Sequence, residues 1–506
     1  MTDIQSTATV PEFVRAIAAT HGDRPAIVLD EHVLTYRALE AESAEMARGL
    51  LARGVGKGSR IGLLLPNSPE FAVAWAAVSR IGAVAVPLST YMKGRELGRV
   101  VRHADLAGLI GRRTIVSQDF AQQLESALPG LADVDVDAGS GPLALPGAPF
   151  LRWVVLSGDD RPAWARGPDW LTAGAAAPYD DSLLAAVESE VHPQDPALMI
   201  YTSGQSADPK GVPHTHGGLI NKVHYLTEMM GVTAEHAPEA VMPFFWVGGL
   251  AITLFPTFEA GGVVICHEKP TVAVLPLGNV SRGGEPEPPP GWKAFSSLGM
   301  TETFAIYAWG TVSLVGSHPY VPLDFFEPGY DVKVVDPMGR PVPDGARGEI
   351  LIRGPSVTPG HHKVPRSTYF DADGFFKTGD EGLVDGDRIH FLGRLGDMIK
   401  TRMANVAPPE VEQEIVALDG VATAYVVAVD DPTLGQAVGA AIVPEEGADL
   451  TPEAIAAALR SEISTFKVPK VMVIVPNEEI PVTPSNKLNK RALAALIAER
   501  GQWVSR

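Results

Sequence analysis

One loop constrains this chain more than any other segment. Residues 201–211 read Tyr-Thr-Ser-Gly-Gln-Ser-Ala-Asp-Pro-Lys-Gly and follow a short apolar run at 197–200, which predicts a strand. Such a loop can bring backbone N–H groups, the hydroxyls of Thr202 and Ser203 and the Lys210 ammonium close to a polyphosphate. Its spacing is not the Walker pattern, and clusters of Ser, Gly, Asp and Pro also form solvated turns. Taken alone, the loop leaves a phosphate site and an ordinary turn equally open.

Composition limits the class of protein. The chain has 506 residues, enough for two or more domains, and 45% of them are hydrophobic. Acidic residues outnumber basic ones by 60 to 41, a formal net charge of −19. This charge disfavours nucleic acid and anionic membranes as partners, although local basic pockets for a nucleotide remain compatible with it. No run of 18 or more apolar residues predicts a membrane span, and the N-terminus lacks the pattern of a secretion signal.

The chain has a single cysteine. Cys266 ends the apolar run Gly-Val-Val-Ile-Cys, so we expect a buried strand residue rather than a nucleophile. One cysteine cannot form an internal disulfide, which fits a protein of the reducing cytoplasm.

Apolar periodicity predicts an α/β protein with two domains. Strands at 60–65 and 82–87 flank a helix at 70–81, an alternation typical of a largely parallel sheet. From residue 332, short strands separated by glycine turns predict a β-rich subdomain. The Pro/Gly-rich piece at 283–291 is expected to be a flexible surface connection.

The C-terminal part returns to mixed structure, with helices expected at 409–418 and 452–462 and strands at 424–429 and 471–475. We therefore expect a large N-terminal domain over residues 1–396, made of α/β sheets plus the β-rich subdomain. A small α+β domain follows over residues 397–506, and we place a hinge near Asp397.

Four further motifs follow the loop in a fixed order. They are 298–303 (Leu-Gly-Met-Thr-Glu-Thr), 376–380 (Phe-Lys-Thr-Gly-Asp), 393–400 (Gly-Arg-Leu-Gly-Asp-Met-Ile-Lys) and 481–487 (Pro-Val-Thr-Pro-Ser-Asn-Lys). With the loop, they resemble the adenylate-forming superfamily of acyl- and aryl-CoA synthetases, over nearly the whole chain. The resemblance implies an enzyme that activates a carboxylic acid with ATP and Mg²⁺, has a mobile C-terminal domain and passes the acyl group to CoA.

The resemblance also implies where the nucleotide binds. The residues expected at the phosphates come from the loop: Thr202, Ser203, Gly204 and Lys210. The residues expected at the ribose are Asp380 and Arg394. A carboxylate can accept hydrogen bonds from both ribose hydroxyls, but Thr-Gly-Asp is also an ordinary turn.

The expected catalytic residues are Thr301, Glu302 and Lys487. A carboxylate beside a polyphosphate is useful when it holds a metal, and Mg²⁺ takes carboxylate and phosphate oxygens; the alternative for Glu302 is a carboxylate that interacts with a helix dipole. The resemblance places Thr301 at the α-phosphate and Lys487 at the charge that develops during attack. His214 and His216 have metal-like spacing, but no third ligand accompanies them and we assign them no metal role.

Residues 243–250 (Pro-Phe-Phe-Trp-Val-Gly-Gly-Leu) resemble the acid-pocket segment of the family. The candidate pocket residues are Trp246, Val247, Gly248 and Gly249, and the alternative is an ordinary aromatic core cluster. The glycines would leave space beside the reactive carboxylate. Trp246 and the glycines favour an apolar acyl or aryl acid, but the sequence does not say which one.

Three departures from the family pattern bear on activity. Leu298 stands where an aromatic residue commonly stacks on adenine, and only 50 residues separate Gly249 from Gly299, several tens fewer than usual. Met403 replaces a usual glycine near the pantetheine channel and could narrow it. Two alternatives to a CoA ligase therefore stay open: adenylation with a carrier-protein thiol, an amine or another small nucleophile as acceptor, or a weakened nucleotide-binding homologue. A homodimer is also open.

Overall fold

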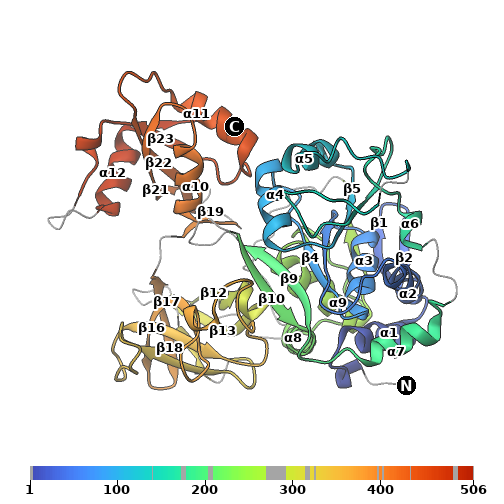
Figure 1. Cartoon of the computed structure of the whole chain (residues 1–506). Helices are drawn as coiled ribbons and strands as arrows, with labels where there is room; N and C mark the ends of the chain where they lie inside the picture. Colours follow the sequence, from blue (N-terminus) through green and yellow to red (C-terminus); the bar gives the residue numbers. More distant parts are fainter. Residues whose placement is uncertain are drawn as a thin grey trace. The chain divides into compact units, whose positions relative to one another are not determined.

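The computed structural model describes residues 4–138, 141–172, 178–202, 209–268, 292–313, 320–323, 326–395, 398–401, 404–432, 435–482 and 488–504. The chain divides into two compact units (Figure 1). The first comprises Met1–Thr90, Val101–Tyr201 and Gly211–Gly393, and the second comprises Tyr91–Val100, Thr202–Lys210 and Arg394–Arg506. Asp397 lies outside the described residues, so the hinge and the boundary between 396 and 397 stay predictions.

A six-stranded sheet forms the centre of the α/β part of the chain. Its strand order is β10-β9-β4-β3-β5-β8. The strands are β3 (Arg60–Leu64), β4 (Val84–Pro87), β5 (Gly108–Arg112), β8 (Trp153–Ser157), β9 (Pro196–Thr202) and β10 (Lys210–Thr215). β3 pairs in parallel with β4 and β5, β4 with β9, and β5 with β8. The expected largely parallel sheet is therefore present, because helices connect successive strands across its faces.

Helix α3 (Pro69–Arg80) shows how the sequence builds this layer. Ser68 caps it by accepting a hydrogen bond from the Phe71 N–H, and proline occupies the first turn, where no N–H is needed. Nearly every α3 side chain is buried, and Trp75 packs against Phe255 with ring centroids 4.5 Å apart. The neighbouring helices are α1 (Val10–His21), α2 (Tyr36–Ala52), α7 (Asp181–Ser189), α8 (His216–Met230) and α9 (Phe255–Ala260).

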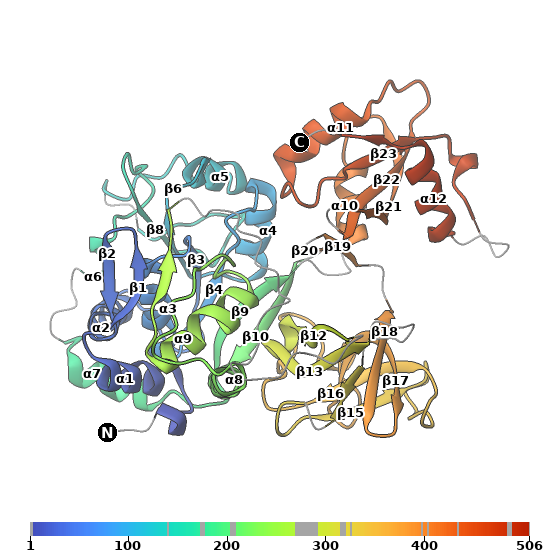
Figure 2. The ribbon, with the colours of Figure 1, turned by 180° about the vertical axis from the view of Figure 1, so that it is seen from behind.

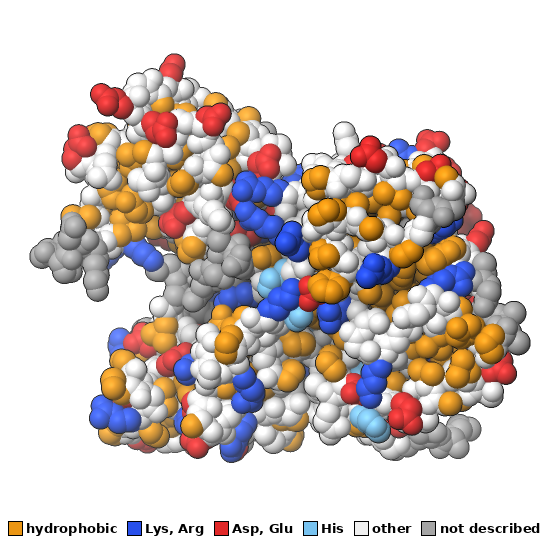
Figure 3. Space-filling view, in the orientation of Figure 1, with side chains coloured by type: hydrophobic (Ala, Val, Ile, Leu, Met, Phe, Trp, Pro, Cys, Tyr) orange, Lys and Arg blue, Asp and Glu red, His pale blue; other side chains and the backbone are white. Residues whose placement is uncertain are grey.

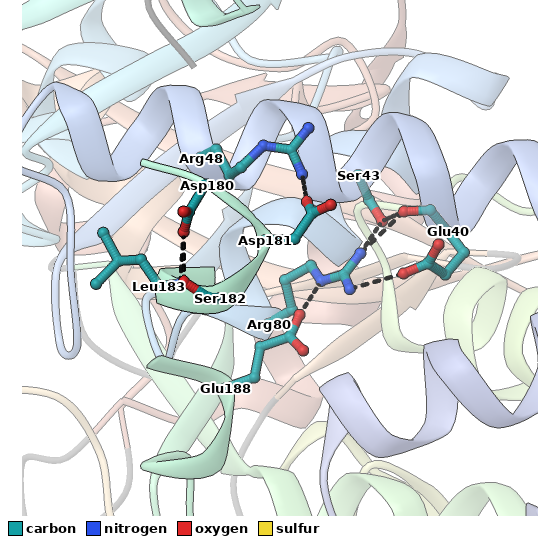
Figure 4. A network of polar contacts seen from close by, with 9 residues as sticks. All are labelled: Glu40, Ser43, Arg48, Arg80, Asp180, Asp181, Ser182, Leu183 and Glu188. Atoms are coloured by element: carbon teal, nitrogen blue, oxygen red, sulfur yellow. Dashed lines mark hydrogen bonds and ion pairs between the residues drawn. The ribbon is translucent and has the colours of Figure 1, made fainter. Parts of the chain in front are cut away.

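A buried arginine ties three of these helices together (Figure 4). The Arg80 side chain is 2% exposed and forms ion pairs with Glu188 of α7 and Glu40 of α2. It also donates to the Ser43 hydroxyl at 2.9 Å. A buried charge is tolerated only when it is paired and hydrogen-bonded, so this network fixes how the helices pack. Arg15 of α1 also pairs with Glu188, and α1 and α7 run side by side in both ribbon views (Figures 1 and 2).

A small mixed sheet holds the cysteine. Strands β11 (Val264–Cys266), β1 (Pro25–Leu29) and β2 (His32–Thr35) form it in that order. Cys266 is 1% exposed, and burial raises the pKa of its thiol to about 12. The expectation of a buried strand cysteine is confirmed. Among the described residues, no helix combines the length and apolar character needed to cross a membrane.

The β-rich subdomain is present, but it begins at Trp292 rather than at the expected residue 332. It is a seven-stranded sheet of order β12-β13-β14-β18-β17-β16-β15, and the pairings between its described strands are antiparallel. Its strands are β12 (Trp292–Met300), β13 (Ala305–Ser313), β14 (Tyr320–Pro322), β15 (Asp331–Val335), β16 (Gly348–Arg353), β17 (Phe376–Asp385) and β18 (Arg388–Arg394). Tyr307, Ile350 and Ile389 are fully buried in its core.

The second unit has its own sheet and core. The sheet runs β20-β19-β22-β23-β24, and β21 pairs with β22. These strands are β19 (Ile399–Thr401), β20 (Ala404–Val406), β21 (Val421–Asp431), β22 (Gly435–Pro444), β23 (Val471–Ile474) and β24 (Gln502–Trp503). Its helices are α10 (Pro408–Val416), α11 (Pro452–Glu462) and α12 (Lys490–Arg500). The predicted helices and strands of this region are therefore present, within a few residues of their expected ends.

Charged groups of both signs cover the face drawn in Figure 3, where Lys and Arg side chains gather in several groups. The net charge of −19 therefore coexists with local basic surface.

Candidate functional site

The Thr301–Glu302 motif forms a single 3-10 turn, Thr301–Thr303, between β12 and β13. The Thr303 hydroxyl closes the turn by donating to the Ala305 carbonyl at 2.6 Å and accepting from the Met300 N–H at 3.2 Å. Phe304 and Ala305 take positive φ angles of 50° and 85°, which is uncommon for residues with a side chain and is frequent at functional sites. The turn leaves the Glu302 side chain 18% exposed.

Gly299 is needed for this turn because two backbone segments approach closely. A Cβ atom at this position would lie 2.8 Å from the Ala305 carbonyl oxygen. Real Cβ atoms do not approach backbone that closely, so any other residue would move the turn. Leu298, which replaces the expected adenine-stacking aromatic, is 9% exposed and belongs to the core of the β-rich subdomain.

The segment after β16 holds the Glu302 turn. The Thr358 N–H donates to the Glu302 carbonyl at 2.7 Å, and the Thr358 hydroxyl donates to the Pro213 carbonyl at 2.6 Å. His361 Nε2 lies 3.1 Å from Glu302 Oε1. Three contacts therefore join this segment to the turn and to β10. Sequence reasoning missed His361, because 59 residues separate it from Glu302 and no local pattern marks the pair.

The histidine pair of β10 and α8 lies in the protein interior. Burial lowers the pKa of His214 to about 3, which outweighs the opposing effects of the Glu302 charge and of a hydrogen bond to the Thr301 backbone. Burial likewise lowers the pKa of His216 to about 4, and its Nδ1 accepts from the Val10 N–H at 3.2 Å. Both rings are therefore uncharged near pH 7 and act in packing. Within the part of the chain that the structure describes, no three His, Cys, Asp or Glu residues are grouped to hold a metal.

Glu302 still fits Mg²⁺ in the presence of a nucleotide. Mg²⁺ commonly takes one or two protein carboxylates and fills its other positions with phosphate oxygens and water. The partly exposed Glu302 carboxylate supplies a hard oxygen ligand of this kind, and the preceding residue, Thr301, carries a hydroxyl.

The Thr378-Gly379-Asp380 motif forms a bulge in β17. The register of β16 and β17 shifts between Glu349 and Leu351, opposite this motif. The Thr378 hydroxyl donates to the Ile350 carbonyl at 2.6 Å and accepts from the Asp380 N–H at 3.0 Å. Gly379 takes a positive φ of 70°. Bulges commonly redirect a side chain beside a site, and this one fixes the backbone of Asp380, whose side chain is largely buried.

The candidate acid-pocket segment is held by a residue that sequence reasoning did not single out. The Asn67 amide donates to the carbonyls of Ala240 (2.8 Å) and Met242 (2.9 Å), and its oxygen accepts from the Phe244 N–H at 2.7 Å. The Asn67 side chain therefore satisfies three backbone groups just before Trp246.

Trp246, Val247 and Gly248 are partly buried, and Gly249 opens a π-helix, Gly249–Leu254. A Cβ on Gly249 would lie 2.1 Å from the Pro243 carbonyl oxygen, so backbone packing alone requires this glycine. π-Helical turns are rare and often occur at functional sites. The Trp246 ring contacts Phe245 edge-on, with centroids 5.4 Å apart.

The remaining predicted residues are only partly described. Thr202 ends β9 and Lys210 begins β10, so both flank the candidate phosphate loop, whose Ser203 and Gly204 lie outside the described residues. Arg394 ends β18, and its side chain is not described. Asp397, Met403, Lys487 and the Pro/Gly-rich piece 283–291 also lie outside the described residues.

This fold and the ordered motifs are those of an adenylate-forming enzyme. The sequence model of the AMP-binding enzyme family matches residues 14–282 and 290–362, and that of the AMP-binding enzyme C-terminal domain matches residues 410–487. The chain therefore belongs to the AMP-binding enzyme family. The resemblance to adenylate-forming enzymes of the acyl-CoA synthetase type is confirmed.

Relatives are similar over nearly their whole lengths. The chain is 30% identical to a feruloyl-CoA synthase of an Amycolatopsis species, covering 90% of this chain and 92% of the relative. It is 26% identical to a sulfoacetate–CoA ligase of Cupriavidus necator, covering 96% and 97%. The amide bond synthetase McbA of Marinactinospora thermotolerans has the same fold, with a TM-score of 0.72, 23% identity and coverage of 96% and 99%.

Proposed function

We propose that this protein uses ATP and Mg²⁺ to convert a carboxylic acid into an acyl-adenylate, and then transfers the acyl group to CoA. The observation that carries the proposal is the Glu302 turn, which keeps a carboxylate partly exposed within the matched AMP-binding region. The names of relatives that align over about nine-tenths of this chain support a thiol acceptor.

In the first half-reaction, a substrate carboxylate oxygen attacks the α-phosphorus of ATP. A P–O bond forms, the bond to the bridging oxygen breaks, and pyrophosphate leaves. We assign the phosphate contacts to Thr202, Ser203, Gly204 and Lys210, and the α-phosphate contact to Thr301. Mg²⁺ held by Glu302 would offset the charge of the phosphates. Lys487 would stabilise the charge that develops between acid and phosphate.

In the second half-reaction, the CoA thiol attacks the acyl carbonyl and AMP leaves. Asp380 and Arg394 would hold the ribose throughout. Rotation of the C-terminal domain about Asp397 would withdraw Lys487 and bring the acceptor channel at Met403 to the adenylate. Such a motion lets one site carry out two different reactions in turn.

The identity of the carboxylic acid is the part of the proposal that the family and the site specify least. Relatives include enzymes named for feruloyl, sulfoacetate and oxalate acyl groups, so membership of the family does not fix it. Trp246, Val247, Gly248 and Gly249 favour an apolar acyl or aryl acid, because their side chains carry no charge and include a single polar group, the indole N–H of Trp246.

Met403 favours one alternative. If its side chain narrows a pantetheine channel, an amine or another small nucleophile would take the place of CoA while the first half-reaction stays the same.

The test is acid-dependent ATP–pyrophosphate exchange across a panel of aryl, aliphatic and dicarboxylic acids. Positive acids are then assayed for product with CoA and, separately, with amines. Exchange with an aryl or apolar acid and formation of its thioester would support the proposal. Nucleotide binding without exchange for any acid would contradict it and favour a weakened nucleotide-binding homologue.

A further inference from the structure

Glu302 has a buried histidine as its neighbour. His361 lies in the segment after β16, directly after Gly360. Its side chain is 1% exposed, against 18% for the side chain of Glu302. The 3.1 Å between His361 Nε2 and Glu302 Oε1 lies within hydrogen-bonding range. An ionised carboxylate can only accept, so the hydrogen of this bond belongs to Nε2.

Aromatic packing fixes the orientation of the histidine ring. Tyr369 meets it edge-on with ring centroids 4.1 Å apart, and Phe376 does so at 6.1 Å. Among the described residues, Nδ1 of His361 has no hydrogen-bond partner, so Glu302 is the polar group that this ring reaches. Because the His361 ring is fixed by this packing, it cannot move with the Glu302 carboxylate. The hydrogen bond therefore restricts rotation of the carboxylate.

The backbone of the same segment also restrains the main chain of Glu302. The Thr358 N–H donates to the Glu302 carbonyl. Thr358 is itself bonded to the Pro213 carbonyl, and the His362 N–H donates to the Gly211 carbonyl at 2.8 Å. Main chain and side chain of Glu302 are thus both held by one segment, which is also attached to β10 just after the phosphate loop.

We propose that His361 is a positioning residue for Glu302, holding Oε1 so that the carboxylate is oriented in advance for the Mg²⁺ of a bound nucleotide. The inference rests on the proposed function, because it takes Glu302 as the Mg²⁺ ligand. Hydrogen-bonding partners behind metal ligands commonly change metal affinity or activity by about 10- to 100-fold when they are removed.

The test compares three substitutions of His361. His361→Leu removes the donor, His361→Gln places an amide nitrogen near the position of Nε2, and His361→Asn places it near Nδ1, too far from Glu302. His362→Leu is the matched control, because the neighbouring ring bonds the His103 carbonyl at 3.1 Å and not Glu302. The readout is ATP binding by calorimetry over a range of Mg²⁺ concentrations, repeated with Mn²⁺ detected by electron paramagnetic resonance.

We expect His361→Leu and His361→Asn to raise the metal concentration for half-maximal ATP binding by about tenfold or more, with metal-free ATP binding unchanged. His361→Gln and His362→Leu should stay close to wild type. If His361→Leu does not fold, the comparison of Gln with Asn decides the question, since both are polar and of similar size.

Equal metal dependence in the Gln and Asn variants, or wild-type dependence in the Leu variant, would overturn the positioning role while leaving the proposed function intact. A wild-type protein that shows acid-dependent exchange but whose ATP binding does not depend on metal would overturn the positioning role alone. A wild-type protein with neither property would overturn the proposed function as well.

Discussion

Lys222 and Glu327 form a fully buried ion pair, with side chains 0% and 1% exposed. Lys222 also donates to the Ile306 carbonyl at 2.7 Å, while Glu327 accepts from Asn221 at 2.9 Å and from the Ser356 hydroxyl at 2.9 Å. Burial lowers the pKa of Lys222 to about 8 and raises the pKa of Glu327, so for both partners desolvation outweighs their mutual attraction. The pair is therefore costly to break but is not itself a source of large stability.

We expect Lys222→Met to lower the free energy of unfolding by about 3–5 kcal/mol, because it leaves a buried carboxylate without its cation. The first unit holds about 370 residues, and unfolding entropy is about 2.1 cal/mol/K per residue. A loss of that size then lowers its melting temperature by roughly 4–6 °C. The double variant Lys222→Met/Glu327→Leu should recover most of the loss, since no charge remains buried.

The pH dependence adds a second check. In Lys222→Met the pKa of Glu327 lies above its unfolded value, so the folded state binds a proton that the unfolded state releases. The loss of stability should therefore shrink as the pH falls from near 7 towards the unfolded pKa of about 4.5. Calorimetric melting of the wild type, Lys222→Met and the double variant at several pH values measures these changes. A single variant that melts within about 1 °C of wild type, or a double variant no better than the single, would refute the reasoning.

Four further predictions concern the proposed reaction. Lys487→Ala should reduce the kcat of pyrophosphate exchange by a few hundredfold, a loss of about 3–4 kcal/mol of transition-state stabilisation. ATP affinity should stay within a few fold, because the lysine charge acts mainly in the transition state, and exchange assays and calorimetry measure the two quantities. Glu302→Gln should raise the Mg²⁺ concentration needed for exchange, because an amide oxygen is a poorer ligand for a hard cation. Met403→Gly should speed thioester formation from preformed adenylate and leave exchange nearly unchanged, as single-turnover assays with CoA would show. Asn67→Ala should raise the KM for the acid more than the KM for ATP, because the segment before Trp246 loses three hydrogen bonds.

Each of these predictions can fail on its own. Near-wild-type exchange in Lys487→Ala would remove that lysine from the mechanism, and an unchanged Mg²⁺ titration in Glu302→Gln would make Glu302 structural. Rapid transfer to CoA by the wild type, with no gain from Met403→Gly, would dismiss the obstruction. Equal effects of Asn67→Ala on both KM values would indicate a general loss of structure.

Local patterns allowed the regular elements to be predicted. Helix α11 matches the expected 452–462 at both ends, because Thr451 caps it and Pro452 fills its first position. The strands around α3 were predicted because buried parallel strands are short apolar runs between turn residues. These features depend on residues close together in the sequence.

The restraints on the candidate site depend instead on residues far apart. His361 contacts Glu302 across 59 positions, and Asn67 contacts the 240–244 segment across 173 to 177 positions. Neither pairing produces a period or a motif. For Gly249, the sequence motif predicts that the glycine leaves space for a substrate. The structure instead explains the glycine by close packing against the nearby Pro243 carbonyl.

Because Cys266 is buried, the proposed rotation of the C-terminal domain can be tested with fluorescent labels on introduced cysteines. Thiolates are the reactive form of cysteine, and a 1% exposed thiol with a pKa of about 12 provides almost none near neutral pH. The native chain therefore offers a nearly silent background for maleimide chemistry. Cysteines placed at Met338, 78% exposed in the first unit, and at Val416, 44% exposed in the second, would carry a fluorescence donor and acceptor. Energy transfer between them, followed as ATP, acid and CoA are added in turn, would show whether the two units move between the proposed half-reactions, with all candidate site residues left unchanged.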